Sequence, residues 1–220
     1  MGKIPFVLTL REWQNTYKYP INLIVQASVM DGSDSWQEFP IGMQYSYLHN
    51  YKKGEMLQIG SHESTVLCCF NTTTDSRRRA NVLNRSCIQD NLLKNNIQNI
   101  FVPPNDYFTN LPNYKFVISP EGNGIDCYRH YEALIAGCIP IIEENPQIKE
   151  KYKGCPILFT KNYSEITAEY LLEQYEKMID TEYDFSCLFL SYYDDTTQKY
   201  IKQCGNFWTN ECVGINFYEI

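Results

Sequence analysis

The chain lacks several features that would each define a class of protein. No apolar run approaches the roughly 20 residues of a membrane-spanning helix, and the start MGKIPF has no basic region followed by an apolar stretch. Basic residues are not in excess either, because 19 Lys and Arg stand against 26 Asp and Glu and give a formal net charge of -7. Nucleic acids are held by basic surfaces, so we expect no nucleic-acid partner. The sequence predicts a cytoplasmic protein, soluble and intracellular, without a membrane span.

Motifs of metal and redox chemistry are also missing. The chain has no CxxC pair, no DxD motif and no His-Asp cluster. It does contain nine cysteines, and several lie within or beside apolar runs, where a free thiol behaves as a small hydrophobe: Cys68, Cys69, Cys138, Cys155 and Cys187. We therefore expect structural thiols, no metal ion and no covalently bound cofactor.

Apolar runs and helical patterns alternate from residue 61 onward. The predicted strands are STVLCCF, YKFVIS, CIPII and CPILF, and the predicted helices cover about 75–95, 126–136 and 167–180. This alternation is typical of crossover units, so the fold class is α/β, with a Rossmann-like parallel sheet flanked by helices. The predicted lobe occupies residues 61–220.

The ends of the chain are less regular. FVLTL and INLIVQASV have the composition of strands, while the stretch between residues 30 and 55 is turn-rich and aromatic. We interpret residues 1–60 as a partial N-terminal lobe on the acceptor side. The tail predicts a helix at about 196–203, followed by an irregular end.

The most informative stretch is KFVISPEGNGIDCYRHYEALIAGCIPII, at residues 115–142. Gly122 and Gly124 permit positive φ angles in the turn after a strand, and Asp126 can cap the helix that follows. Orphan N–H groups and the positive end of the helix dipole favour an anion such as phosphate there. Arg129 and Glu132 lie three residues apart on one helix face, where they can contact a diphosphate and a ribose.

Simpler explanations exist for the same residues. Glycines after a strand often make only a tight turn, and an Arg–Glu pair at helical spacing is often a solvated ion pair. The run SRRR, which follows the first strand of the lobe, presents the same choice. A basic first turn opposes the helix dipole, so Arg78 and Arg79 either bind an anion or turn outward to neighbouring acids. Aromatic side chains such as Tyr107 are candidates to stack on a base.

Residues 114–175 resemble the C-terminal nucleotide-sugar-binding domain of exostosin-like glycosyltransferases, of the kind also found in large DNA viruses. The matching pattern is a Ser-Pro, GNGxDCxRxxEAL, a small residue and GxxPI. The resemblance implies a two-lobed fold of the GT-B type, here with a shortened N-terminal lobe. It implies an enzyme, a hexosyl- or pentosyltransferase that moves a sugar from a nucleotide-diphosphate sugar to a hydroxyl of a glycan or glycoprotein. By position, the donor would contact Gly122, Asn123, Gly124, Arg129 and Glu132.

The catalytic base is not identified by the pattern. An inverting transfer needs a carboxylate or a His that deprotonates the acceptor, and the candidates in the first part of the chain are Asp31, Asp34 and Glu38, which are more often ordinary turn residues. A retaining reaction is equally permitted. Without a metal motif, basic side chains and a helix N-terminus would neutralise the leaving diphosphate. Glu121 stands where the family pattern has a basic residue, so its carboxylate has to point away from the diphosphate.

Two other classes of protein fit the sequence. The short first lobe permits a nucleotide-sugar-binding protein without transfer activity. An unrelated Rossmann-like enzyme, such as a methyltransferase or a dehydrogenase, is the second alternative. Against the dehydrogenase, GNG does not continue as GxGxxG and does not lie in the first crossover.

Overall fold

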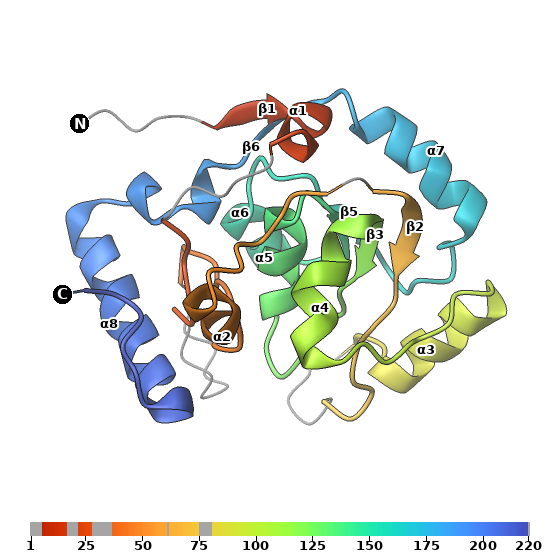
Figure 1. Ribbon diagram of the computed structural model, residues 1–220. Coiled ribbons are helices and arrows are strands. Elements are labelled where there is room, and N and C mark those ends of the chain that lie inside the picture. The colour runs from red at the N-terminus through yellow and green to blue at the C-terminus, as the bar shows by residue number, and fades with distance from the viewer. Residues whose placement is uncertain (1–5, 17–21, 28–36, 61, 75–80, 220) are drawn as a thin grey trace.

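A computed structural model of the chain describes residues 6–16, 22–27, 37–60, 62–74 and 81–219 (Figure 1). Four of its strands form a parallel sheet in the order β2-β3-β4-β5. Their bounds are Ser64–Leu67 for β2, Tyr114–Ile118 for β3, Ile139–Glu143 for β4 and Leu158–Thr160 for β5. The α/β prediction is confirmed, because this sheet is parallel and flanked by helices, as in a Rossmann-like lobe.

Helices connect the strands and cover both faces of the sheet. They are α3 (Arg85–Lys94) and α4 (Pro104–Asn110) before β3, α5 (Tyr128–Ile135) before β4, α6 (Pro146–Lys151) before β5, and α7 (Ala168–Met178) after it. Neighbouring residues of a strand point to opposite faces. Phe116 of β3 accordingly contacts Tyr175 of α7, whereas Val117 packs with Leu111 and Ala133 on the side of α4 and α5. Figure 1 shows α4 and α5 side by side in front of the sheet.

The first helix of the lobe begins later than predicted. We expected a helix over about 75–95, but α3 starts at Arg85, because the side chain of Asn84 accepts a hydrogen bond from the Cys87 amide (2.8 Å) and caps it there. The segment 97–102 then passes the end of β2, where the Ile100 amide donates to the Cys68 carbonyl (2.8 Å).

The N-terminal part contributes a second, small sheet. FVLTL is a strand as predicted: β1 (Val7–Thr9) pairs antiparallel with β6 (Glu182–Asp184) and leads into α1 (Leu10–Gln14). The prediction for INLIVQASV is wrong within the described residues 22–27, which form only isolated bridges from Leu23 and Val25. The helix α2 (Tyr47–Lys52) follows.

The tail is more helical than predicted. After the short 3-10 turns η2 (Ser186–Leu188) and η3 (Leu190–Tyr192), helix α8 runs from Asp195 to Val213, beyond the predicted 196–203. A further 3-10 turn, η1 (Leu111–Asn113), precedes β3. The chain then folds back along α8, and Asn206 exchanges two hydrogen bonds with the backbone of Tyr218. The predicted irregular end is therefore wrong for residues 204–213, which are helical, whereas residues 214–219 form no helix or strand, as predicted.

One hydrophobic core includes side chains from both sides of residue 60. Trp13 of α1 stacks on Phe185, and its indole nitrogen donates to the carbonyl of Leu134 in α5 (3.1 Å). The buried hydroxyl of Tyr131 accepts from the Ile24 amide and donates to the Leu188 carbonyl. The division into lobes at residue 60 stays a prediction. In the described part of the chain, no helix is long and apolar enough to cross a membrane.

Candidate functional site

The site candidate is the turn between β3 and α5, at the carboxyl end of the sheet. Residues 119–127 leave β3 and enter α5 at Cys127, whose backbone is extended (φ -145°, ψ 156°). Asn123 and Gly124 are exposed, while Gly122 is buried. Neither glycine has a positive φ, so the reason we gave for them is wrong. Among the described residues, a Cβ on Gly124 would contact only the Asp126 carbonyl, at 3.9 Å, so a ligand can approach the backbone at this exposed tip of the turn.

Arg85 fixes the conformation of this turn. Its buried guanidinium donates to the carbonyls of Pro120 and Glu121, both at 2.9 Å, and to the carbonyl of Asn71 at 2.8 Å. A Cβ on Gly122 would lie 3.3 Å from this guanidinium, so a glycine lets the turn approach it. The predicted Arg78 and Arg79 lie outside the described residues, so they stay predictions, whereas Arg85 was missed by the sequence analysis. Its place directly after a capping Asn was the signal.

Arg129 lies in the first turn of α5 and is half-buried. Its Nε is buried, and no hydrogen-bond partner for it occurs among the residues described. Since a buried guanidinium nitrogen normally has a partner, this orphan donor is available to a group other than the described residues. The nearby Tyr107 hydroxyl is a second buried group that lacks a hydrogen bond within the described ranges.

Glu132 lies one turn further along α5 and is almost fully buried. Its carboxylate accepts a hydrogen bond from the Gln44 amide at 3.1 Å, which ties α5 to the N-terminal part. Burial raises the pKa of this carboxyl to about 7, although the Gln44 amide and the charge of Arg129 both oppose the shift. Glu132 is therefore a poised acid–base group rather than a permanently charged one.

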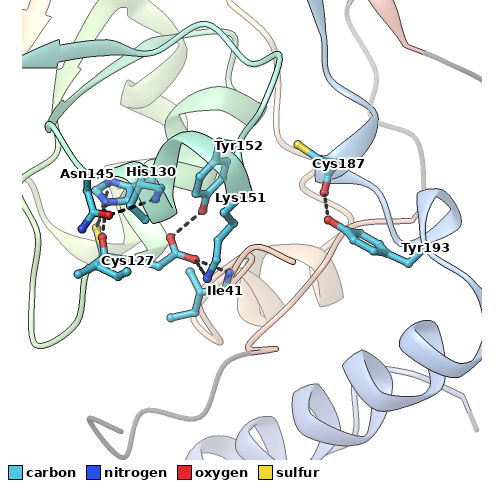
Figure 2. Close-up of polar contacts among 11 residues, drawn as sticks. Ile41, Cys127, His130, Asn145, Lys151, Tyr152, Cys187 and Tyr193 are labelled. Carbon is cyan, nitrogen blue, oxygen red and sulfur yellow. Dashed lines mark hydrogen bonds and ion pairs between the residues drawn. The ribbon is translucent and has the colours of Figure 1, made fainter. Parts of the chain in front are cut away.

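Asp126 has a structural part that the sequence did not reveal. It was expected to cap α5, but Cys127 is the N-cap residue and no side chain caps this helix. Figure 2 shows Lys151, Tyr152 and Ile41 converging on one carboxylate, which is that of Asp126. Lys151 donates from 3.1 Å and the Tyr152 hydroxyl from 2.8 Å, and the ion pair is buried. These partners lie in α6 and in the N-terminal part, so the side chain has turned away from the helix end.

Glu121 points away from the exposed tip of the turn, as required. Its side chain is 1% exposed, and the Asn145 amide lies 3.5 Å from its carboxylate. Its backbone amide donates to the carboxylate of Glu143 at 2.9 Å. The negative charge at this position therefore faces the ends of β4 and α6.

The described residues do not identify the catalytic base. Asp31 and Asp34 lie outside the described residues, and Glu38 is exposed. What the described residues bring together is a bare turn, the first N–H groups of α5 and an arginine with an unused donor. That arrangement can bind an anion.

A comparison with protein families supports the α/β lobe described above. The family model of the RXYLT1 C-terminal domain matches residues 61–202, which is more than half of the chain and includes the whole parallel sheet. No curated protein matches the chain.

Proposed function

Because the chain belongs to the RXYLT1 C-terminal domain family, one of the exostosin-like glycosyltransferases, we propose that it transfers a sugar from a nucleotide-diphosphate sugar to a hydroxyl acceptor. The resemblance seen in the sequence is confirmed at the family level, and a glycosyltransferase-like domain follows from it. The proposal adds the donor class, a glycan or glycoprotein acceptor, a GT-B arrangement of two lobes and a transfer of hexose or pentose without a metal ion.

The orphan donor of Arg129 is the observation that carries the proposal. A guanidinium offers a planar fork that matches a phosphate, and here it stands in the first turn of a helix, where the dipole also favours negative charge. Arg85 cannot serve instead, because its guanidinium is occupied by the carbonyls of Pro120 and Glu121 and by Asn71.

The rest of the proposed donor site follows from the neighbours of Arg129. The exposed backbone of Asn123 and Gly124 would contact the diphosphate, and Glu132 would accept hydrogen bonds from the ribose hydroxyls. The Arg129 cation and the partial positive charge of the α5 N-terminus would stabilise the charge that develops on the leaving diphosphate. Neither the base nor the stereochemical course is part of the proposal.

Calorimetry with UDP-, GDP-, CMP- and ADP-sugars tests the donor site. We expect one of them to bind the parent protein and Arg129→Ala to weaken it by about 10- to 150-fold, the loss of a hydrogen bond to a charged group. Arg129→Lys keeps the charge but not the fork, so its affinity should fall between the two. Arg11→Ala is the matched control, because this exposed arginine pairs only with Asp180 at the other end of the chain.

Three results would contradict the proposal. An unchanged dissociation constant in Arg129→Ala would remove this residue from the site. Donor binding without sugar transfer or donor hydrolysis would favour the non-catalytic alternative. Stabilisation by S-adenosylmethionine or NAD, with none by any nucleotide sugar, would place the chain among other Rossmann-like enzymes.

A further inference from the structure

Cys127 and His130 form a pair of reactive groups at the N-terminus of α5. The Cys127 sulfur lies 3.4 Å from Nδ1 and 3.6 Å from Nε2 of the His130 ring. Figure 2 shows the two side chains pointing toward one another beside the end of β3. His130 is fully buried, whereas Cys127 keeps part of its surface exposed. A reagent therefore has to reach the pair from the side of Cys127.

The neighbours of His130 determine which nitrogen takes a proton from the thiol. Nε2 lies 3.3 Å from the carbonyl of Ile125, and since a carbonyl only accepts, this nitrogen carries a hydrogen. Nδ1 is then the acceptor nitrogen of the neutral ring, and the Ser119 hydroxyl, 2.6 Å away, donates to it. The Cys127 sulfur lies at similar distances from both ring nitrogens, so it does not lie along the lone pair of Nδ1. A proton can pass from the thiol to the Ser119 hydroxyl, whose oxygen lies 3.8 Å from the sulfur, while this hydroxyl gives its own proton to Nδ1, which leaves a thiolate beside an imidazolium. The Ile125 carbonyl orients the ring for this transfer.

The charges around the sulfur favour the thiolate. Burial opposes it, but the attraction of His130, of Arg129 and of Arg85 outweighs burial and lowers the pKa of the Cys127 thiol to about 7. The imidazolium has support of its own. Burial lowers the pKa of His130, yet Cys127, followed by the carboxylates of Asp126 and Glu143, raises it overall.

We propose that Cys127 is a modification site at the entrance of the donor site, where hydroperoxides and alkylating electrophiles react with the sulfur and thereby block donor binding. The first half, the reactivity, stands on the Cys127–His130 geometry alone. The second half rests on the proposed function.

The chemistry at the sulfur is a simple displacement. With a hydroperoxide ROOH, the thiolate attacks one peroxide oxygen, a sulfur–oxygen bond forms and the O–O bond breaks. The sulfur loses two electrons to the peroxide, and ROH leaves with the proton that the imidazolium supplies. The product is a sulfenic acid. With iodoacetamide, a sulfur–carbon bond forms and iodide leaves.

A group attached to the Cys127 sulfur has to occupy space in the proposed donor site. The sulfur lies 3.8 Å from both the Ser119 hydroxyl and the Pro120 carbonyl, at the base of the turn, and two residues before Arg129. An adduct therefore separates the turn from the first residues of α5. Donor phosphate would have to bridge these same two elements.

The alkylation rate of Cys127 as a function of pH tests the reactivity. Iodoacetamide labelling followed by peptide mass spectrometry gives the rate for each cysteine separately. We expect the Cys127 rate to rise with a midpoint near pH 7 and to reach about 10% of its plateau at pH 6, against about 0.3% for a thiol with the usual pKa of about 8.5. Partial burial lowers the labelling rate of Cys127 by the same factor at every pH, so it does not move the midpoint of the profile. A midpoint at or above 8.5, or no labelling of Cys127, would overturn the proposal.

His130→Gln separates the pair from simple exposure. The amide cannot take the proton, so the midpoint of Cys127 should move up by at least one pH unit while circular dichroism shows an intact fold. If His130→Gln does not fold, the imidazole of His130 can be followed in the parent protein by NMR. It should titrate at the same pH as Cys127, and this titration step should be absent in Cys127→Ser. Independent titration of the two groups would contradict the pairing.

The blocking effect is measured by calorimetry after labelling at pH 6. Labelled parent protein should lose nucleotide-sugar binding, labelled Cys127→Ser should keep it, and Cys87→Ser, which lacks an exposed thiol on α3, should behave like the parent. Bound donor should in turn slow the labelling of Cys127. Full donor binding by the labelled parent would refute the blocking. If the unlabelled parent binds no nucleotide sugar, the proposed function fails, and the pH profile of Cys127 still decides the reactivity.

Discussion

Glu132 shows how one buried residue can link the site to pH. Its folded-state pKa lies near 7, above its ordinary value of 4.5, because burial disfavours the charge. Between these two values the folded chain keeps a proton that the unfolded chain has released, so the free energy of unfolding falls as the pH rises from about 5 to 8. We expect this residue alone to cost about 3 kcal/mol of stability above pH 7.

The measurement is urea unfolding of the parent and of Glu132→Gln at pH 5, 6, 7 and 8. The glutamine stays neutral and its carbonyl can still accept from the Gln44 amide, so the difference between the two proteins isolates this titration. The stability of Glu132→Gln relative to the parent should rise with pH. Parallel pH profiles would show that Glu132 titrates as an exposed carboxyl does.

Among the proposed substitutions, we expect replacement of Asp126 to lower the free energy of unfolding most. Asp126→Asn removes the charge that faces the buried Lys151 ammonium, and breaking one side of a buried ion pair costs about 3 to 5 kcal/mol. Asp180→Asn is the control, because its ion pair with Arg11 is exposed and contributes at most about 1 kcal/mol. Chemical denaturation gives both values. Equal losses in the two variants would contradict the structural part assigned to Asp126.

Arg129 was proposed from the sequence because its signal is local: a Gly-containing turn and the start of a helix lie within a few residues of it. Arg85 and Asp126, in contrast, contact residues that are far away in the sequence. Arg85 contacts carbonyls 35 and 36 residues away, and Asp126 contacts the Ile41 amide 85 residues away. Helical spacing and capping preferences contain no information on such pairs, so the capping residue expected at Asp126 was wrong.

At the scale of elements, the four parallel strands were predicted within a few residues, because each is a compact apolar run between turn signals. The extent of α8 was not predicted. Gly205 and Asn206 are weak helix formers, and we ended the helix before them. Tertiary contact explains them, since Asn206 holds the returning chain at Tyr218. The strand prediction for residues 22–27 was wrong for the opposite reason: their composition suits a strand, but only single bridges form.

Gly205→Ala measures which effect dominates in α8. Helix propensity favours alanine by about 1 kcal/mol. The added Cβ would, however, lie 2.5 Å from the Val25 carbonyl and 2.8 Å from the ring of Tyr218. Because overpacking costs about 1 to 3 kcal/mol and here includes backbone, we expect a net loss of stability in thermal unfolding. Gln203→Ala, at an exposed position of the same helix, should change little, and a stabilised Gly205→Ala would show that α8 can move away.

The whole molecule is held by contacts between its first and last parts. Leu10, Trp13, Ile24 and Met43 belong to the same buried cluster as Tyr131 and Phe185. A chain that begins at residue 61 would expose the surfaces of α5 and η2 that these side chains cover. We therefore expect residues 61–220 alone to lack cooperative urea unfolding and to bind a hydrophobic dye, while the full chain unfolds in one transition. Cooperative unfolding of the shorter chain would support an independent lobe from residue 61.

The bond between the Val25 amide and the Tyr218 hydroxyl spans 193 residues and carries a consequence for biosynthesis. A ribosome adds about 5 to 20 residues per second, so the partner of Val25 leaves the exit tunnel roughly 10 to 40 s after Val25 does. Until then the apolar stretch NLIVQ lacks this last partner, although Met43 and Tyr131, which it also contacts, have already emerged. The nascent segment therefore completes its packing only after Tyr218 has emerged, and we expect it to be more accessible to a chaperone before that point than after it.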